Sequence, residues 1–134
     1  MTDISHVGIA VENLEEAIKK FTDIFGYGPS ETVEMDDMNL RVALFSKDNG
    51  STGNVELLAP TDKPSSIKKY LEKNGSGLHH IAIVVDDIEK KLAELKEKGY
   101  RLIDEIPRVG AMGHKIAFVH PSSVNGILFE LVQK

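Results

Sequence analysis

The sequence contains no cysteine and no tryptophan, and its aromatic residues are limited to three tyrosines and five phenylalanines. The absence of cysteine excludes disulfide bonds, thiolate catalysis and cysteine-based zinc sites. Any metal site in this protein must therefore use histidine, aspartate or glutamate. The chain has five histidines and 21 acidic residues from which such a site could be built.

An excess of basic residues is also lacking. Sixteen lysines and arginines face 21 acidic residues, so the formal net charge is −5. Proteins that bind nucleic acid usually carry a basic stripe or patch that neutralises phosphates. We therefore expect no nucleic-acid partner.

Long hydrophobic runs are missing as well. The longest apolar run, at residues 81–85, is far shorter than the roughly 20 residues that a membrane-spanning helix needs. The first residues do not show the basic stretch followed by an apolar stretch that is typical of a signal peptide. We expect a cytoplasmic protein with no membrane partner.

What the chain does contain is an internal repeat. Residues 3–15 read D-I-S-H-V-G-I-A-V-E-N-L-E, and residues 77–89 read G-L-H-H-I-A-I-V-V-D-D-I-E. At this offset of 74 residues His6 falls on His80, and Glu56 falls on Glu130. The length of 134 residues suits one domain. We predict a single domain over residues 1–134, with module 1 at about 3–60, a helical linker at 61–76 and module 2 at about 77–134.

Each module shows the same order of predicted elements. Apolar residues alternate over residues 3–11 as in a strand, and a helical stripe then runs from Leu14 to Phe25 with Asn13 as its cap. Strands are predicted at about 31–35, 40–46 and 54–59, with a turn at 48–51. In module 2, Asp86 or Asp87 caps a helix ending at Gly99. Strands are then predicted at about 101–105, 115–119 and 127–132, and Pro64 is predicted to open the linker helix. The fold class is α+β, with two βαβββ modules in tandem.

Four polar residues lie inside these apolar strands: His6, Glu56, His80 and Glu130. A carboxylate buried in an apolar strand costs several kcal/mol unless a cation or hydrogen-bond donors meet it. If the modules are related by a pseudo-twofold axis, the two histidines and two glutamates can meet in a site for a divalent ion. If the offset is accidental, all four are ordinary structural or edge residues. His79 points to the opposite face of its strand from His80, which suggests packing or support of the site.

The donor set narrows the choice of ion. Nitrogen and oxygen ligands without sulfur suit Co2+, Mn2+, Ni2+, Fe2+ or Zn2+, and of these we place Co2+ first. Two further positions in an octahedral shell would let a substrate bind through two oxygens. A chelated carbonyl becomes more acidic at its α-carbon, because the ion stabilises the enolate as its charge develops.

The residues resemble those of a known family. The segments I-S-H-V-G-I-A-V-E-N-L-E at 4–15, V-E-L-L-A-P at 55–60, G-L-H-H-I-A-I-V-V-D-D-I at 77–88 and H-P-S-S-V-N-G-I-L-F-E-L at 120–131 carry the resemblance. Paired βαβββ modules with such ligands resemble the vicinal oxygen chelate (glyoxalase) superfamily, in which the likeness is greatest to the methylmalonyl-CoA epimerases. The resemblance implies a curved mixed sheet around a metal site.

The resemblance also implies a reaction and a ligand set. Family members interconvert (R)- and (S)-methylmalonyl-CoA by metal-assisted transfer of the α-proton through an enolate. The implied ligands are His6, His80 and Glu130, with Glu56 in a fourth position that is often Gln, and Glu130 is also the implied acid/base. An acyl-CoA substrate and a homodimer are implied as partners.

The second acid/base and the substrate-binding residue are less clearly matched by this sequence than the metal ligands are. Some members supply a second acid/base from a glutamate in the third strand, and the matching position here is Ala43. Glu56, an acid within residues 34–37 or a water is left for this role. The segment 108–115 resembles the substrate loop, so Lys115 is predicted to meet a carboxylate or phosphate of the substrate. The alternative is a solvated lysine on a mobile surface loop.

Two other functions are compatible with the same resemblance. One is that of lactoylglutathione lyase (glyoxalase I) or a related metal-dependent isomerase, which uses a comparable site on a glutathione hemithioacetal. The other is a non-catalytic drug-binding protein of the same fold, a group that generally lacks the metal ligands. Metal content and substrate assays distinguish the three.

Overall fold

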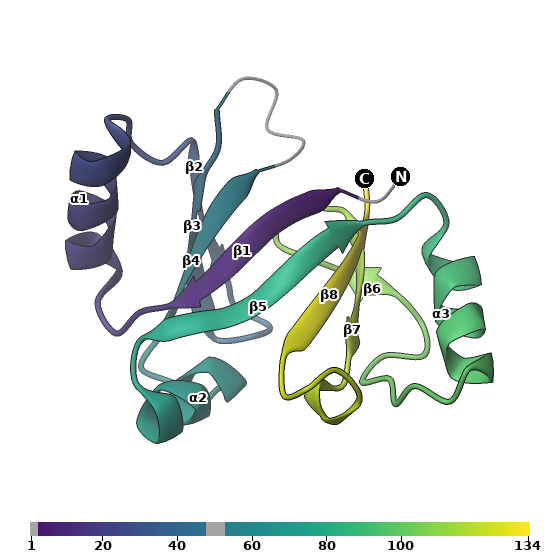
Figure 1. The fold of residues 1–134 in the computed structure, drawn as a ribbon. Coiled ribbons are helices and arrows are strands. Elements are labelled where there is room, and N and C mark those ends of the chain that lie inside the picture. The colour runs from purple at the N-terminus through teal and green to yellow at the C-terminus, as the bar shows by residue number, and fades with distance from the viewer. Residues whose placement is uncertain (1–2, 48–52) are drawn as a thin grey trace. The chain divides into compact units, whose positions relative to one another are not determined.

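The computed structural model describes residues 3–47 and 53–134, and the turn predicted at 48–51 lies outside them. The helices and strands follow the predicted order of two βαβββ modules joined by a helix (Figure 1). They are β1 (Ile4–Ala10), α1 (Leu14–Phe25), β2 (Glu31–Met35), β3 (Leu40–Phe45), β4 (Asn54–Pro60), α2 (Ser66–Asn74), β5 (Gly77–Val84), α3 (Ile88–Glu97), β6 (Arg108–Val109), β7 (Lys115–Val119), the short 3-10 helix η1 (Pro121–Ser123) and β8 (Leu128–Gln133).

The chain divides into two compact units that do not coincide with the two sequence repeats. One unit consists of Val7–His79, and the other combines Met1–His6 with His80–Lys134. The strand order is β2-β3-β4-β1 in the first unit and β1-β5-β8-β7-β6 in the second, so β1 and β5 contribute residues to both. The pairing is mixed, because β5 and β8 are parallel while β2, β3 and β4, and likewise β6, β7 and β8, pair antiparallel.

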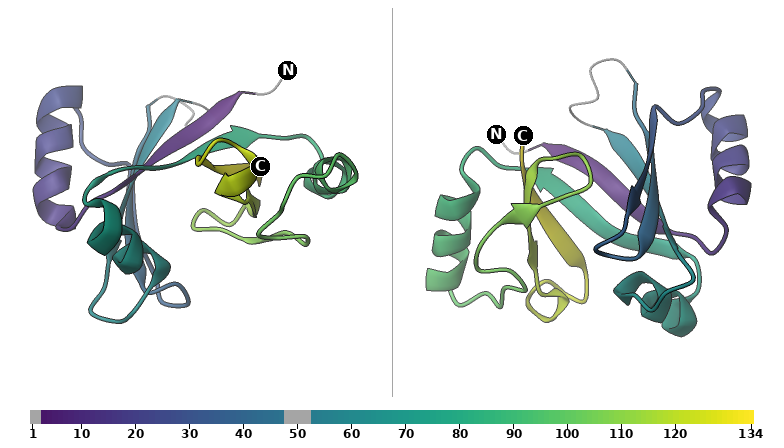
Figure 2. Two further views of the ribbon diagram at one scale, coloured as in Figure 1. Left: turned by 60° about the horizontal axis from the view of Figure 1, so that its bottom comes forward. Right: turned by 180° about the vertical axis from the view of Figure 1, so that it is seen from behind.

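In the unit Val7–His79, α1 covers one face of β3 and β4 (Figure 2). Strand alternation turns Ala43 and Phe45 of β3 toward this helix, together with Leu57 and Ala59 of β4. These residues pack with Leu14, Ala17 and Val11 in one buried cluster. The helical stripe predicted from the sequence is therefore the face that α1 buries.

The second unit is built in the same way. Helix α3 packs against β7 and β8 through Ile88 and Leu92, which contact Ala117 and Leu131 in a buried cluster. On the opposite face of β7 and β8, Ile116 and Val132 form a smaller buried cluster with Ala82 of β5, and Phe118 lies at its edge. This second face also carries the buried side chains of His80 and Glu130.

The helix caps explain where each helix begins. The side chains of Asn13 and Asp87 accept hydrogen bonds from the backbone N–H of Glu16 and Lys90, so Asp87 rather than Asp86 caps α3. The prediction that Pro64 opens the linker helix is wrong, because α2 begins at Ser66 after a Ser65 cap. Serine satisfies a backbone N–H of the first turn with its hydroxyl, which proline cannot do.

One predicted strand is also wrong. Residues 101–105 form only a single bridge, between Leu102 and Val119, and the edge strand β6 is two residues long at Arg108–Val109. The backbone N–H of Phe118 donates to the Asp104 carboxylate at 2.8 Å. The side chain thus takes the place of a backbone acceptor and interrupts the ladder, as aspartate often does.

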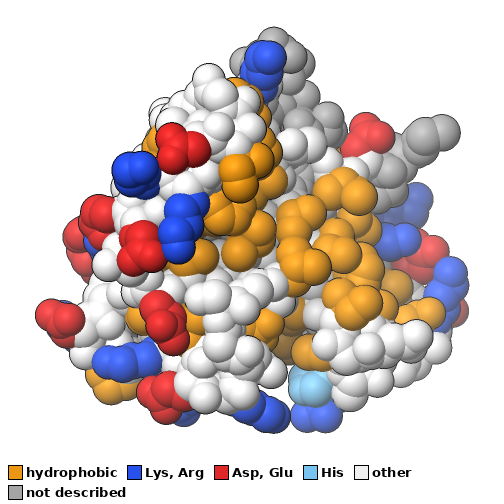
Figure 3. Space-filling view, turned by 60° about the vertical axis from the view of Figure 1, so that its left-hand side comes forward, with side chains coloured by type: hydrophobic (Ala, Val, Ile, Leu, Met, Phe, Trp, Pro, Cys, Tyr) orange, Lys and Arg blue, Asp and Glu red, His pale blue; other side chains and the backbone are white. Residues whose placement is uncertain are grey.

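The surface contains charges of both signs. On the described part of the face in Figure 3, lysine and arginine side chains are interspersed with aspartates and glutamates. Along α1 they form pairs one turn apart, Lys20 with Glu16 and Lys19 with Asp23. Among residues 3–47 and 53–134 no helix is long and apolar enough to cross a membrane.

Candidate metal centre

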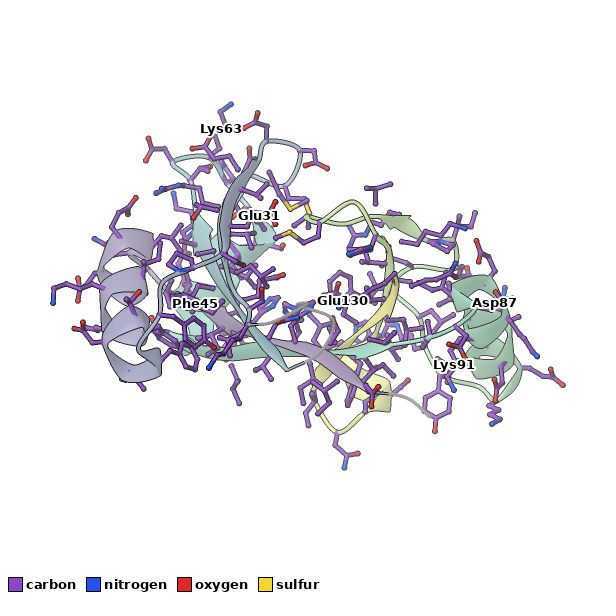
Figure 4. The ribbon with its side chains drawn as sticks, turned by 90° about the horizontal axis from the view of Figure 1, so that it is seen from above. Glu31, Phe45, Lys63, Asp87, Lys91 and Glu130 are labelled. Atoms are coloured by element: carbon purple, nitrogen blue, oxygen red, sulfur yellow. The ribbon has the colours of Figure 1, made fainter. Side chains whose placement is uncertain are left out.

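His6, His80 and Glu130 come together within the unit that combines both ends of the chain. They lie on β1, β5 and β8, and all three are buried. Strand alternation turns His80 and Glu130 to the face of the sheet that α3 does not cover. Figure 4 shows Glu130 on the side of β8 away from Asp87 and Lys91 of α3.

The ligand atoms of the three side chains converge. His6 Nε2 and His80 Nε2 are 3.0 Å apart, and Glu130 Oε1 lies 3.4 Å from His6 Nε2 and 3.1 Å from His80 Nε2. The two imidazole rings meet edge to face, with their centroids 5.1 Å apart. Three donors from residues far apart in the sequence therefore point at one small region.

This donor set fits a divalent metal ion. Nitrogen and oxygen ligands bind first-row ions at about 2.0–2.2 Å, so ligands of one ion lie roughly 3.0–3.4 Å from each other. The three observed separations fall in this range. His6, His80 and Glu130 could therefore hold a metal ion as they stand.

The electrostatics of Glu130 favour a ligating carboxylate. Burial alone raises the pKa of this carboxyl group, but hydrogen bonds from the imidazoles of His6 and His80 outweigh the burial and hold the pKa at about 2. The group is thus ionised at neutral pH. Only the ionised form offers a charged oxygen to a cation.

Two residues that the sequence analysis did not single out support the histidines. The Oγ of Ser5, itself buried, lies 3.2 Å from His6 Nδ1. The ring of Phe118 packs edge-on against His80, with the centroids 6.0 Å apart. A serine in a strand such as Ser5 is common, and an apolar residue such as Phe118 is expected in a hydrophobic core. Neither residue therefore indicates a metal site in the sequence.

His79 differs from its neighbour His80 as predicted. Its ring packs edge-on against Tyr70 of α2, with the centroids 4.8 Å apart. Because successive residues of a strand face opposite ways, this contact leaves His80 to the other face. The structure thus assigns a packing contact to His79.

Glu56 belongs to the other unit, Val7–His79. It is buried in β4, where it pairs with Leu44 of β3. Ala43, taken as the match to the second acid/base, faces α1 instead, so Leu40, Val42 and Leu44 are the β3 residues on the face of Glu56. The place of Glu56 in the ligand set stays a prediction.

Lys115 is exposed at the start of β7. Its Nζ lies 2.9 Å from Glu89 Oε1 on α3, and this ion pair lowers the pKa of the Glu89 carboxyl. The contact places the ammonium group on the α3 side of the sheet, whereas His80 and Glu130 face the other side. Its contact with substrate stays a prediction.

Comparison with known proteins places this site in a family. A model described as the Glyoxalase/Bleomycin resistance protein/Dioxygenase superfamily matches residues 5–118. The chain belongs to this superfamily. The prediction of the vicinal oxygen chelate fold is thereby confirmed.

Among its superfamily relatives are methylmalonyl-CoA epimerases. The mitochondrial enzyme of Dictyostelium discoideum is 37% identical over 132 residues, covering 98% of this chain and 78% of the relative. The human mitochondrial enzyme is 37% identical over 131 residues, covering 97% of this chain and 73% of the relative. A solved methylmalonyl-CoA epimerase in complex with methylmalonyl-CoA and NH4+ has a TM-score of 0.91 and 34% identity, with 100% of this chain and 95% of that chain covered.

Proposed function

We propose that this protein is an isomerase that interconverts (R)- and (S)-methylmalonyl-CoA. The observation that carries the proposal is its similarity, over the whole chain, to an epimerase solved in complex with methylmalonyl-CoA. The cluster of His6, His80 and Glu130 supports it, because a bound divalent ion would stabilise the enolate that forms when the proton next to a thioester is removed.

His6, His80 and Glu130 would hold the ion, with Glu56 as the fourth ligand. When bound, the ion supplies positive charge at the thioester oxygen and so makes the C–H bond at the α-carbon more acidic. Co2+ is the ion we place first, and Mn2+, Ni2+ and Zn2+ suit the same nitrogen and oxygen donors.

Epimerisation moves one proton off one face of the α-carbon and returns a proton to the other face. Two acid/base groups are therefore needed, one on each side. We assign Glu130 as the first, in keeping with the family resemblance and with its place in the cluster of possible metal ligands. Among the described residues Glu56 and Glu130 are the two buried acidic side chains, which favours Glu56 over the exposed Glu34 as the second group.

The remaining parts of the proposal concern partners. An acyl-CoA substrate is supported by the named relatives, and we further propose a homodimer located in the cytoplasm. Size-exclusion chromatography with light scattering tests the dimer directly, since a mass near 14.8 kDa would contradict it.

Exchange of the α-proton with solvent tests the reaction. Metal-loaded protein is incubated with (R)- or (S)-methylmalonyl-CoA in D2O, and deuterium at the α-carbon is followed by mass spectrometry against a sample without enzyme. We expect rapid incorporation by the wild type and none above background by His80→Ala, which should stay soluble but lose metal.

Other results of the exchange and metal-content measurements would contradict different parts of the proposal. Incorporation no faster than in buffer would overturn the epimerase, and turnover of a glutathione hemithioacetal would then indicate the lyase. A metal content near zero in protein produced with Co2+ or Mn2+ would favour a non-catalytic binding protein. Full metal content in His80→Ala would overturn the ligand assignment.

A further inference from the structure

Arg108 lies on the same face of the sheet as the metal ligands. It pairs with Ile116 across β6 and β7, and residues paired across two strands share a face. Ile116 belongs to the cluster of Ala82 and Val132 with Phe118, which is the face of His80 and Glu130. The next pair, Val109 with Lys115, therefore faces the other way, in agreement with the ion pair between Lys115 and Glu89.

The guanidinium of Arg108 is held next to the metal centre by two contacts. Its Cζ lies 5.3 Å from the centre of the Phe118 ring, and the same ring packs against His80. Its Nε lies 3.3 Å from Asp104 Oδ1, and the other oxygen of that carboxylate accepts the backbone N–H of Phe118. One aromatic ring thus separates the cation from a metal ligand.

The same contacts leave the guanidinium accessible. The Arg108 side chain is 43% exposed, whereas its anchor Asp104 is 15% exposed. The ion pair uses Nε, so the geometry allows the Nη groups to meet a ligand. Arginine binds carboxylate and phosphate oxygens with two parallel hydrogen bonds, which makes it suited to orient an anion.

We propose that Arg108 binds an oxyanion of the acyl-CoA and so positions the acyl group at the metal centre. This inference rests on the proposed function. A net charge of −5 provides no general attraction for an anionic substrate, so the attraction would have to come from local cations such as Arg108. The acyl carboxylate and the phosphates of CoA share the chemistry that would recognise this arginine.

Three variants distinguish the effect of the positive charge of Arg108 from the effect of its planar guanidinium group. Arg108→Met removes the cation but keeps an apolar chain over Phe118, and Arg108→Lys keeps the charge without the planar fork. Arg101→Met makes the same change of charge at another exposed position of the same unit. Metal content and the unfolding midpoint are measured for each, together with kcat and KM for exchange in D2O.

We expect Arg108→Met to raise KM about tenfold or more with metal content unchanged, because a hydrogen-bonded ion pair is lost. Arg108→Lys should recover part of the loss and Arg101→Met should match the wild type. The two oxyanions are distinguished with methylmalonyl-pantetheine, which lacks the CoA phosphates. If Arg108→Met still raises KM for this substrate, Arg108 binds the acyl carboxylate; if the difference from the wild type disappears, Arg108 binds the phosphates. An unchanged KM in Arg108→Met, or an equal rise of KM in Arg101→Met, would overturn the inference. A further variant, Lys115→Met, tests the other cation of the segment: a rise of KM in this variant and not in Arg108→Met would also overturn the inference.

Calorimetric binding of methylmalonyl-CoA separates this inference from the reaction. Binding by the wild type that weakens in Arg108→Met, without any exchange, would support Arg108 and overturn the epimerase. Exchange by the wild type with equal binding by both proteins would overturn the role of Arg108 alone. No binding by the wild type would overturn both.

Discussion

The two equivalent histidines have different surroundings. His6 has a hydroxyl beside its Nδ1, since Ser5 Oγ lies 3.2 Å away. The residue that precedes His80 is His79, which packs on Tyr70. If Nε2 of His6 binds the ion, its proton sits on Nδ1 and is donated to the Ser5 oxygen, which fixes the tautomer and the ring orientation. The hydroxyl of Ser5 thus stands at the repeat position where the second module has His79.

Ser5 offers a test of this support. Ser5→Thr and Ser5→Val add the same bulk to a buried position, but only threonine keeps the hydroxyl. We expect Ser5→Val to weaken Co2+ binding roughly 10–100-fold, the usual cost of losing such a partner, and Ser5→Thr to bind as the wild type does. Titration followed by the visible absorption of Co2+ measures both. Equal affinities in the two variants would exclude a role for the hydroxyl.

The helices and the strands differ in how well the sequence predicts their positions. Helix α1 was predicted closely, because its apolar stripe and the Asn13 cap are local signals. The strand expected at 101–105 was not found, because the Asp104 side chain, rather than a backbone carbonyl, accepts the N–H of Phe118. A sequence pattern shows alternation but cannot show which acceptor a distant N–H will use.

The cap of α1 can be tested by a pair of substitutions. Asn13→Ala removes the acceptor for the Glu16 N–H, so the free energy of unfolding should fall by about 0.5–2 kcal/mol. Asn13→Asp keeps an acceptor and should retain most of the stability. Chemical denaturation of metal-loaded protein gives both values. A wild-type midpoint for Asn13→Ala would show that the cap contributes nothing measurable.

One compact unit draws on both ends of the chain. The backbone N–H of Val84 donates to the Asp3 carbonyl at 2.8 Å, and His6 contributes a donor to the cluster with His80 and Glu130. A bound ion would thus join segments that the unfolded chain keeps far apart. Ligands that bind only the folded state stabilise it by mass action.

Metal removal should therefore lower the stability of the protein. At a free-ion concentration about 100 times Kd, binding contributes about 2.7 kcal/mol, so chelation should lower Tm by several degrees. Differential scanning calorimetry with and without Co2+ measures the shift. His80→Ala serves as the control and should show the same Tm in both conditions. An equal shift in this variant would mean that the ion binds elsewhere.

Local patterns predicted the fold class, helix α1 and the repeat in which His6 corresponds to His80 and Glu56 to Glu130, because periodicity and repeats can be read along the chain. The folded chain was needed to bring Nε2 of two histidines within 3.0 Å and to hold the Glu130 pKa at about 2, since both depend on neighbours from distant strands. The folded chain also decides which way the side chains of Arg108 and Lys115 face. Strand pairing, which no local signal specifies, turns Arg108 to the face of the metal centre and Lys115 to the helix.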